Sequence, residues 1–218
     1  GHEVRIFDRF EAAKTNIQHL LPACELVQGD FGNHAVVREI TRGMDIVYHL
    51  IATTLPKSSN DDMVFDVSSN VIPTLHLLEA CRQHRVKKVI YFSSGGTVYG
   101  VPSEIPIPET HHTHPICSYG IHKIAIEKDL HRYFSLHKLD YAIMRVANPD
   151  GERQRTDGAQ GAVAVFLGKM LRNQPIDIWG DGSIVRDYLH VRDVADAAML
   201  LAEAGAAGPE GSRTFNIG

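Results

Sequence analysis

The sequence has little cysteine and no long hydrophobic run, and each scarcity excludes a class of protein. Its three cysteines, Cys24, Cys81 and Cys117, are odd in number and widely spaced, which argues against a disulfide framework or a zinc site and indicates a reducing compartment. No apolar run approaches membrane-spanning length, and no signal-peptide pattern is present. We therefore expect a cytoplasmic globular protein with no membrane partner.

An excess of charge of one sign is also lacking. The chain has 22 Lys and Arg against 26 Asp and Glu, a formal net charge of -4, which gives no electrostatic reason to expect a nucleic acid partner. The hydrophobic content of 44% and charged content of 22% are ordinary for a globular protein. At 218 residues the chain can bury a large core.

Short apolar runs that alternate with helical patterns predict the fold. We expect strands at 4–7, 25–28, 45–50, 88–92, 141–146, 176–178 and 186–189. We expect helices at 33–42, from 63 onward, from 118 onward, at 162–173 and at 191–205. The apolar stripe of the second of these helices would comprise Met63, Val67, Val71, Leu75 and Leu78. This alternation predicts an α/β class with a Rossmann-like, doubly wound parallel sheet.

A phosphate-binding loop of the form Gly-x-x-Gly-x-x-Gly is missing from the sequence. In such folds this loop follows the first strand, and neither end of the chain looks like a natural terminus, so we expect truncation at both ends. We assign 1–150 to a dinucleotide-binding domain that lacks its first strand and loop. We assign 151–218 to part of a smaller substrate-binding lobe, interleaved with that domain.

Tyr119 and Lys123 are the central candidates for chemistry. They are one helical turn apart, on the same face as the apolar Ile126, Leu130 and Phe134. A lysine there would favour the phenolate and lower the tyrosine pKa, so that the phenol could exchange protons near neutral pH. Taken alone, this pair is more typical of a snorkelling lysine beside a core tyrosine.

Several polar residues follow predicted strands, at the sheet edge where ligands bind in such folds. Asp8 and Asp30 could hydrogen-bond an adenosine ribose or simply form turns. Ser93, Ser94 and Thr97 follow the fourth strand, at the same edge as Tyr119, so hydroxyls and phenol could converge on one substrate.

Two further features of the sequence allow more than one interpretation. Asn148 and Arg186 could bind a ligand, although Asn-Pro favours a turn and Arg186 could pair with a neighbouring aspartate. The histidines at 111, 112 and 114 lie in a proline-rich loop without suitably spaced carboxylates, so we assign no metal.

Four motifs in order carry a resemblance to a known family. They are YFSSGGTVYG at 91–100, Tyr119-x-x-x-Lys123, Arg145-x-x-Asn148-Pro149, and Gly180-Asp181-Gly182 followed by Arg186-Asp187-Tyr188. The chain resembles, from end to end, the NAD-dependent epimerase/dehydratase family of extended short-chain dehydrogenase/reductases. The resemblance implies an NAD-dependent enzyme acting on a UDP-sugar or another nucleotide sugar, and a homodimer formed through helices like 61–84 and 119–138.

The resemblance also implies residue roles. Tyr119 would be the acid/base, Lys123 would lower its pKa and hold the nicotinamide ribose, and Thr97 and Ser94 would hydrogen-bond the reacting oxygen. The residues that would contact NAD also include Asp8, Asp30, Phe31, Leu50, Ile51, Ala52, Asn70 and Ser93. The residues that would bind the substrate's nucleotide diphosphate are Asn148, Trp179 and Arg186.

Departures from the family pattern narrow the expected reaction. Gly95 stands where many members carry Ser or Thr, so another hydroxyl, which we take to be Thr97, must replace it. Dehydratases and decarboxylases of the family usually have an acidic residue in this loop, and Gly95-Gly96-Thr97 supplies none. We therefore expect an epimerase, at the sugar's fourth carbon. A dehydratase or reductase of the same superfamily, or a catalytically idle NAD-binding protein, are the alternatives.

Overall fold

The computed structural model describes residues 1–158, 160–178, 180–204 and 212–218. The strands are β1 (Val4–Asp8), β2 (Cys24–Gln28), β3 (Ile46–His49), β4 (Lys88–Ser94), β5 (Asp140–Val146), β6 (Asn148–Asp150), β7 (Tyr188–His190) and β8 (Thr214–Ile217). The helices are α1 (His34–Ile40), α2 (Met63–His84), α3 (Ser118–His137), α4 (Ala162–Leu171) and α5 (Val191–Glu203), with a short 3₁₀ turn at Leu21–Ala23.

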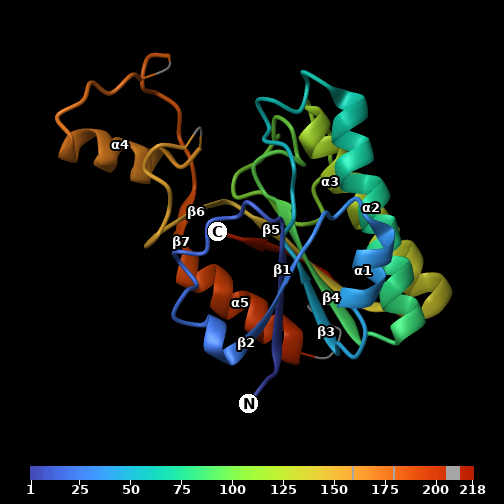
Figure 1. Ribbon diagram of the computed structural model, residues 1–218. Coiled ribbons are helices and arrows are strands. Elements are labelled where there is room, and N and C mark those ends of the chain that lie inside the picture. Colours follow the sequence, from blue (N-terminus) through green and yellow to red (C-terminus); the bar gives the residue numbers. More distant parts are fainter. Residues whose placement is uncertain (159, 179, 205–211) are drawn as a thin grey trace.

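Parallel strands form the centre of the molecule. One sheet has the order β3-β4-β5-β8, and β1 and β2 form a separate parallel pair. Helices α1, α2 and α3 lie on one side of the strands and α5 on the other (Figure 1). Successive residues of β4 alternate accordingly, because Val89 and Tyr91 join the core under α2 and α3 whereas Ile90 joins the core under α5. This arrangement confirms the predicted α/β class.

The second half of the chain contributes to two places. Helix α5 packs on the main sheet, and β8 extends this sheet beside β5. The described residues of 191–217 therefore pack against the part of the structure that the first half of the chain forms. The segment that contains α4 projects from the body (Figure 1) and is joined to it through the short parallel pair β6–β7. Its apolar residues are largely exposed, Leu171 at 86% and Met170 at 60%.

Most predicted elements are confirmed, with two corrections. The long helix begins after Asp62, whose side chain accepts a hydrogen bond from the Phe65 amide. Its predicted apolar stripe is confirmed at Leu78, which is fully buried, but is wrong at the start of the helix. Met63 and Val67 are exposed, because the buried face of the first half of α2 is polar. The strand predicted at 176–178 is also wrong, since residues 174–178 have no regular structure.

A buried ion pair fastens the layers together. The Arg145 guanidinium on β5 donates to both carboxylate oxygens of Glu127 on α3, at 2.6 and 3.2 Å. Glu127 also accepts the Ser93 hydroxyl of β4 at 2.5 Å, and Arg145 donates to the Tyr99 hydroxyl at 2.8 Å. Tyr99 in turn donates to Asn216 on β8. One carboxylate therefore connects α3 with two neighbouring strands and, through Arg145, with a third.

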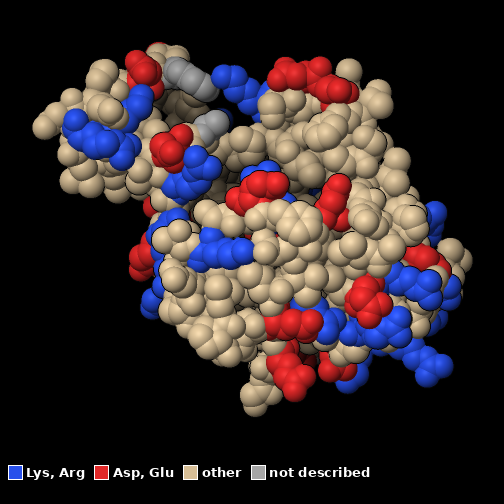
Figure 2. Space-filling view, in the orientation of Figure 1, with Lys and Arg blue, Asp and Glu red and all other residues tan. Residues whose placement is uncertain are grey.

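Over the described residues, no helix combines the length and apolar character needed to cross a bilayer. Figure 2 shows Lys and Arg interspersed with Asp and Glu on the visible face, which fits the near-balanced composition.

Removal of the Glu127 carboxylate tests the importance of this ion pair. We expect Glu127→Ala to lower the free energy of unfolding by about 3–5 kcal/mol, because Arg145 is left as an uncompensated buried charge. Urea denaturation measures the change. Lys87→Ala is the matched control, since its pair with Asp45 is exposed and contributes about 1 kcal/mol or less. Equal effects of the two substitutions would contradict the prediction.

Candidate active site

The carboxyl ends of β3 and β4 and the first turn of α3 meet at one edge of the main sheet. Gly120 makes the approach possible, because a β-carbon there would lie 2.7 Å from the Thr97 carbonyl oxygen. The loop after β4 therefore packs directly against the turn that carries Tyr119. The predicted convergence of Thr97 and Tyr119 follows from this contact.

Lys123 is almost completely buried, at 2% exposure. Its Nζ donates to the Phe92 carbonyl at 2.7 Å and lies 4.8 Å from the centre of the Tyr91 ring and 5.4 Å from that of Tyr119. Burial lowers the Lys123 pKa to about 8, although the carboxylate of Glu127 opposes this change. The lysine therefore sits on the apolar stripe, as predicted, with its ammonium held by a carbonyl and two aromatic faces.

The expected low pKa of Tyr119 is wrong for this structure. Burial, and to a smaller extent Cys117 and Asp66, raise the Tyr119 pKa to about 12. The ammonium of Lys123 is directed to the Phe92 carbonyl, and desolvation of the phenolate outweighs any help from the neighbouring cation. With this pKa the phenol is protonated near neutral pH, and it must gain a stabilising partner before it can act as a base.

The hydroxyls after β4 have distinct environments. Ser93 donates its hydroxyl proton to Glu127, so its side chain could only accept a hydrogen bond from a cofactor. Ser94 is half-buried at the end of β4, and the Thr97 Oγ1 is buried with no hydrogen-bond partner among the described residues. A buried hydroxyl without a partner is costly, and a ligand oxygen would satisfy it. A β-carbon at Gly95 would lie 3.0 Å from the Arg145 carbonyl oxygen, which leaves little room for a side chain there.

A pocket of about 300 Å³ lies beside this edge, between the ends of β2 and β3 and the start of α2. Its lining residues are Asp30, Phe31, Gly32, Thr53, Phe65, Ser68 and Ser69. Asp30 accepts the Gly32 amide at 2.8 Å, and Phe31 is buried against the His49 ring. Of these seven residues, the sequence analysis predicts only Asp30 and Phe31. Phe65, Ser68 and Ser69 come from the first turns of α2, the helix that follows β3 in the chain.

The remaining residues predicted to contact the cofactor differ in their position relative to this pocket. The Asn70 side chain accepts the Thr53 amide at 2.9 Å and donates to the Thr53 hydroxyl at 2.7 Å, so it fixes the turn after β3. Leu50 and Ala52 are exposed on this turn and Ile51 packs against the core. Asp8 is exposed at the end of β1 and caps the Arg9 amide, outside the residues that line the pocket.

The predicted substrate residues lie at the projecting segment. The Asn148 amide donates to the Asp187 carbonyl at 2.8 Å, which joins the β6 and β7 regions. Arg186 is exposed, and its guanidinium donates to the Val185 carbonyl. Trp179 lies outside the described residues.

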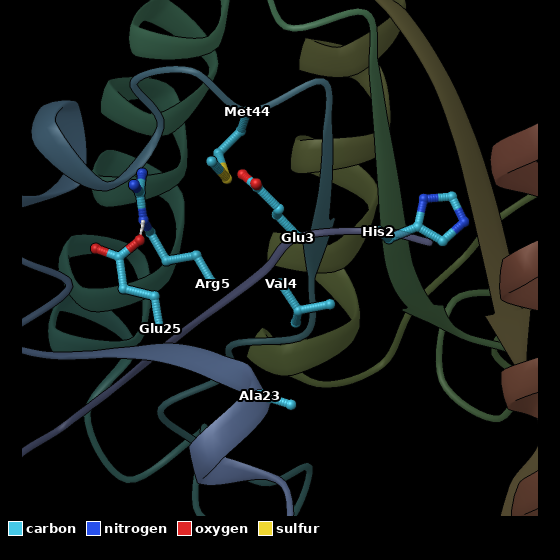
Figure 3. Close-up of a pocket in the computed structure, with 7 residues that line it drawn as sticks. All are labelled: His2, Glu3, Val4, Arg5, Ala23, Glu25 and Met44. Atoms are coloured by element: carbon cyan, nitrogen blue, oxygen red, sulfur yellow. Dashed lines mark hydrogen bonds and ion pairs between the residues drawn. The ribbon is translucent and has the colours of Figure 1, made fainter.

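A second pocket, of about 290 Å³, opens at the amino ends of β1 and β2 (Figure 3). It is lined by His2, Glu3, Val4, Arg5, Ala23, Glu25 and Met44. The polar side chains facing each other across it include the Arg5–Glu25 ion pair at 2.7 Å. Because this is the opposite end of the strands from Tyr119, we do not assign the chemistry to it.

A group of three or more side chains suited to hold a metal ion does not occur among the described residues. His111 is instead buried in a loop network, where it contacts the Ser103 hydroxyl and the His112 carbonyl.

The parallel α/β fold and the tyrosine–lysine pair at its ligand-binding edge define a Rossmann-like protein with a dinucleotide-type site. The model for the "NAD dependent epimerase/dehydratase family" matches residues 1–218. The chain belongs to this family.

Curated relatives cover most of the chain. It is 34% identical over 201 residues to a putative UDP-glucose 4-epimerase of Methanocaldococcus jannaschii, covering 92% of this chain and 65% of that protein. It is 40% identical over 174 residues to the UDP-glucose 4-epimerase of Mycolicibacterium smegmatis, covering 80% and 54%. The chain thus spans between about half and two thirds of the length of these relatives.

Solved structures agree with the fold. The UDP-glucose 4-epimerase of Thermotoga maritima with UDP-glucose is 34% identical, with a TM-score of 0.91 over 100% of this chain and 69% of that one. The Thermus thermophilus UDP-glucose 4-epimerase complex with NAD is 31% identical, with a TM-score of 0.88 over 99% and 70%.

Replacement of Lys123 tests the cost of burying its ammonium. Since the folded pKa is about 8 against 10.5 for a free lysine, the unfolded chain binds more protons between these values, and stability rises with pH there. We expect Lys123→Met to raise the free energy of unfolding at pH 7, by up to about 3 kcal/mol. The gain should shrink from pH 8 to 10.5.

Denaturation of both proteins across this pH range measures the difference. Lys128→Met is the matched control, because Lys128 is exposed on the same helix, and it should leave the pH dependence unchanged. A gain from Lys123→Met that persisted undiminished at pH 10.5 would show that it has another origin.

Proposed function

We propose that this protein is an NAD-dependent nucleotide-sugar epimerase that acts at the sugar's fourth carbon through a transient keto-sugar. The observation that carries the proposal is the convergence of Tyr119, Lys123 and the unpartnered Thr97 hydroxyl at one sheet edge, beside a pocket suited to a dinucleotide. The names of the relatives and the structures with NAD and UDP-glucose support it.

The residues present fit NAD. Asp30 offers a carboxylate to an adenosine ribose, at a pocket whose Phe31 and Thr53 walls could enclose the base. Lys123 offers an ammonium to the nicotinamide ribose, and Asn70 holds the turn between the two. We assign the binding of NAD to 1–150 and part of the binding of the sugar nucleotide to 151–218, and we assign the binding of its diphosphate to Asn148, Trp179 and Arg186.

Bound NAD would supply the acceptor and later the donor of a hydride at the sugar carbon, and the residues of the chain would transfer the proton. Tyr119 would take the proton from the sugar hydroxyl as the C–O bond becomes a carbonyl, and would give it back when the carbonyl is reduced. Thr97 and Ser94 would donate hydrogen bonds to that oxygen. The sugar undergoes no net oxidation or reduction. The configuration of its fourth carbon is inverted if the keto-sugar rotates between the two hydride transfers.

The loop after β4 favours epimerisation over elimination. A dehydratase needs a group that removes a second proton from the sugar, and 95–97 supplies no carboxylate for this step. The runner-up activities, a dehydratase or a reductase, would leave a net change in mass or in cofactor oxidation state.

Incubation with NAD and a panel of UDP- and GDP-sugars, followed by chromatography and mass spectrometry, tests the proposed function. We expect a new isomer of unchanged mass from at least one sugar. A product lighter by one water would indicate a dehydratase, and a product that consumes stoichiometric reduced cofactor would indicate a reductase. Bound NAD with no product from any sugar would favour an idle binding protein.

Two variants separate chemistry from binding in this assay. Tyr119→Phe should lower turnover by roughly 10³-fold or more while NAD affinity is kept, because only the acid/base is lost. Thr97→Val should lower turnover by roughly 10²-fold without loss of stability, since its hydroxyl has no partner within the described protein.

We further propose a cytoplasmic homodimer. The three cysteines are unpaired, which fits a reducing compartment. The outer faces of α2 and α3 expose large apolar side chains, with Val64 at 80%, Met63 at 60% and Ile121 at 55%. Exposed patches of this kind commonly mark protein interfaces.

The mass in solution tests the assembly. Analytical ultracentrifugation should give twice the 24.1 kDa mass of one chain. Val64→Glu should shift the equilibrium to the monomer, because a carboxylate would be buried without a partner in the interface. The matched substitution Val101→Glu, at an equally exposed site in the loop after β4, should leave the dimer intact. A monomer at all concentrations would contradict the assembly.

A further inference from the structure

Asp66 is a fully buried carboxylate that the proposed chemistry does not use. It lies on the face of α2 that packs against α3. The side chains that donate to it are Thr54, Asn70 at 3.2 Å, Ser118 at 2.6 Å and His122 at 2.9 Å. A buried charge is tolerated when donors surround it in this way, and such a network fixes the elements that supply the donors.

One oxygen of this carboxylate holds the turn that carries Tyr119. Oδ2 contacts both the Ser118 hydroxyl and the His122 Nδ1, and these residues precede and follow Tyr119 within one helical turn. The His122 ring lies edge-on to the Tyr119 ring, with 5.1 Å between centres and 69° between planes. Asp66 thus fixes the turn at two points and, through the imidazole, supports one side of the phenol ring.

The backbone of the same turn is held by the segment just before α2. Cys117, the residue just before α3, makes no side-chain capping bond. Instead the Asn60 amide oxygen accepts the Ser118 amide at 2.9 Å, and the buried Ser59 hydroxyl accepts the Tyr119 amide at 3.0 Å. These bonds satisfy donors that a helix start otherwise leaves open.

The other carboxylate oxygen is bonded to residues next to the pocket assigned to the dinucleotide. Oδ1 accepts the Thr54 hydroxyl and the Asn70 amide, and Asn70 in turn holds Thr53, which lines that pocket. A single carboxylate therefore joins the pocket loop to the turn of the acid/base. The two halves are more than 50 residues apart in sequence.

The charge states follow from these contacts. Burial raises the Asp66 pKa, but the hydrogen bonds from His122, Ser118 and Thr54 together bring it below the ordinary value. Burial lowers the His122 pKa below the ordinary value despite the carboxylate beside it. Near neutral pH Asp66 is ionised and His122 is neutral, so Nδ1 must carry the imidazole proton. Ser118 donates to the carboxylate and not to the imidazole, which excludes a nucleophilic triad.

We propose that Asp66 is a positioning residue, which through Ser118 and His122 holds Tyr119 in its reactive orientation and through Thr54 and Asn70 couples that orientation to the dinucleotide pocket. This inference rests on the proposed function for the role of Tyr119. In this role Ser118 and His122, which flank the acid/base, act on Tyr119 and do not contact the substrate.

The kinetic test compares two carboxylates. Asp66→Asn keeps the side-chain shape but replaces one acceptor oxygen with an amide, and we expect kcat to fall roughly 10²-fold together with weaker NAD binding. Asp129→Asn is the matched control, because Asp129 pairs with Arg132 elsewhere on α3, and it should change neither quantity. Asp66→Asn with kcat and NAD affinity within twofold of the unaltered protein would overturn the proposal.

Single-link variants separate positioning from a general loss of structure. Ser118→Ala removes one of the two bonds from Asp66 to α3 and leaves those to the pocket loop, so kcat should fall about 10-fold with NAD affinity unchanged. Thr54→Val removes only the link to the pocket loop, so NAD affinity should fall with the smaller effect on kcat. A merely structural role would move both quantities together in both variants, and that result would overturn the proposal. These two variants also carry the test if Asp66→Asn does not fold.

Nitrogen-15 NMR of the histidine rings tests the arrangement without turnover. His122 should be neutral at pH 7 with its proton on Nδ1, and in Asp66→Asn the proton should move to Nε2, because the new amide donates to Nδ1. A proton on Nε2 in the unaltered protein would overturn the geometry. If no sugar is converted, the proposed function fails separately, and the tautomer and the NAD affinities of the Thr54 and Asp66 variants decide this inference.

Discussion

The structure depends on a cation that is held inside the protein. Lys123 projects from α3 into the core, where desolvation of the ammonium is costly. The Phe92 carbonyl accepts one of its hydrogens, the faces of Tyr91 and Tyr119 lie over it, and Glu127 lies one helical turn beyond. Each of these partners belongs to β4 or α3, so placing the cation also fixes the helix against the strand. The lowered pKa of Lys123 indicates that these partners compensate the desolvation of its ammonium only in part.

The face of the core that α2 covers is polar near the site and apolar elsewhere. Towards the carboxyl ends of the strands, α2 presents Asp66, Asn70 and Thr74 to α3 and β3. Towards the amino ends, it presents Leu77, Leu78 and Cys81 to the same neighbours. The polar half can be buried only because its groups bond to one another, and it orders the loop 53–60 and the start of α3. The apolar half supplies the hydrophobic free energy that holds the layers together.

The sequence was sufficient for those features that depend on local pattern. Strand length and alternation predicted the parallel α/β class, Asp62 marked the start of α2, and one-turn spacing placed Lys123 on the buried face of α3. The sequence failed where a residue's environment depends on distant partners. Met63 and Val67 have an apolar period, yet they are exposed because Asp66 finds donors 52 and 56 residues further along, at Ser118 and His122. No local pattern records such pairings.

The Tyr119 pKa could not be predicted from the sequence for the same reason. Spacing placed a cation near the phenol, and from that alone a lowered pKa follows. The structure adds what the spacing could not, namely that the cation is directed to a carbonyl, that the phenol is desolvated, and that the Asp66 charge is close enough to oppose the phenolate. Burial moves the pKa of each side chain towards its neutral form, to about 12 for Tyr119 and to about 8 for Lys123. Tyr119 therefore needs a further group that favours its phenolate before it can act as a base near neutral pH.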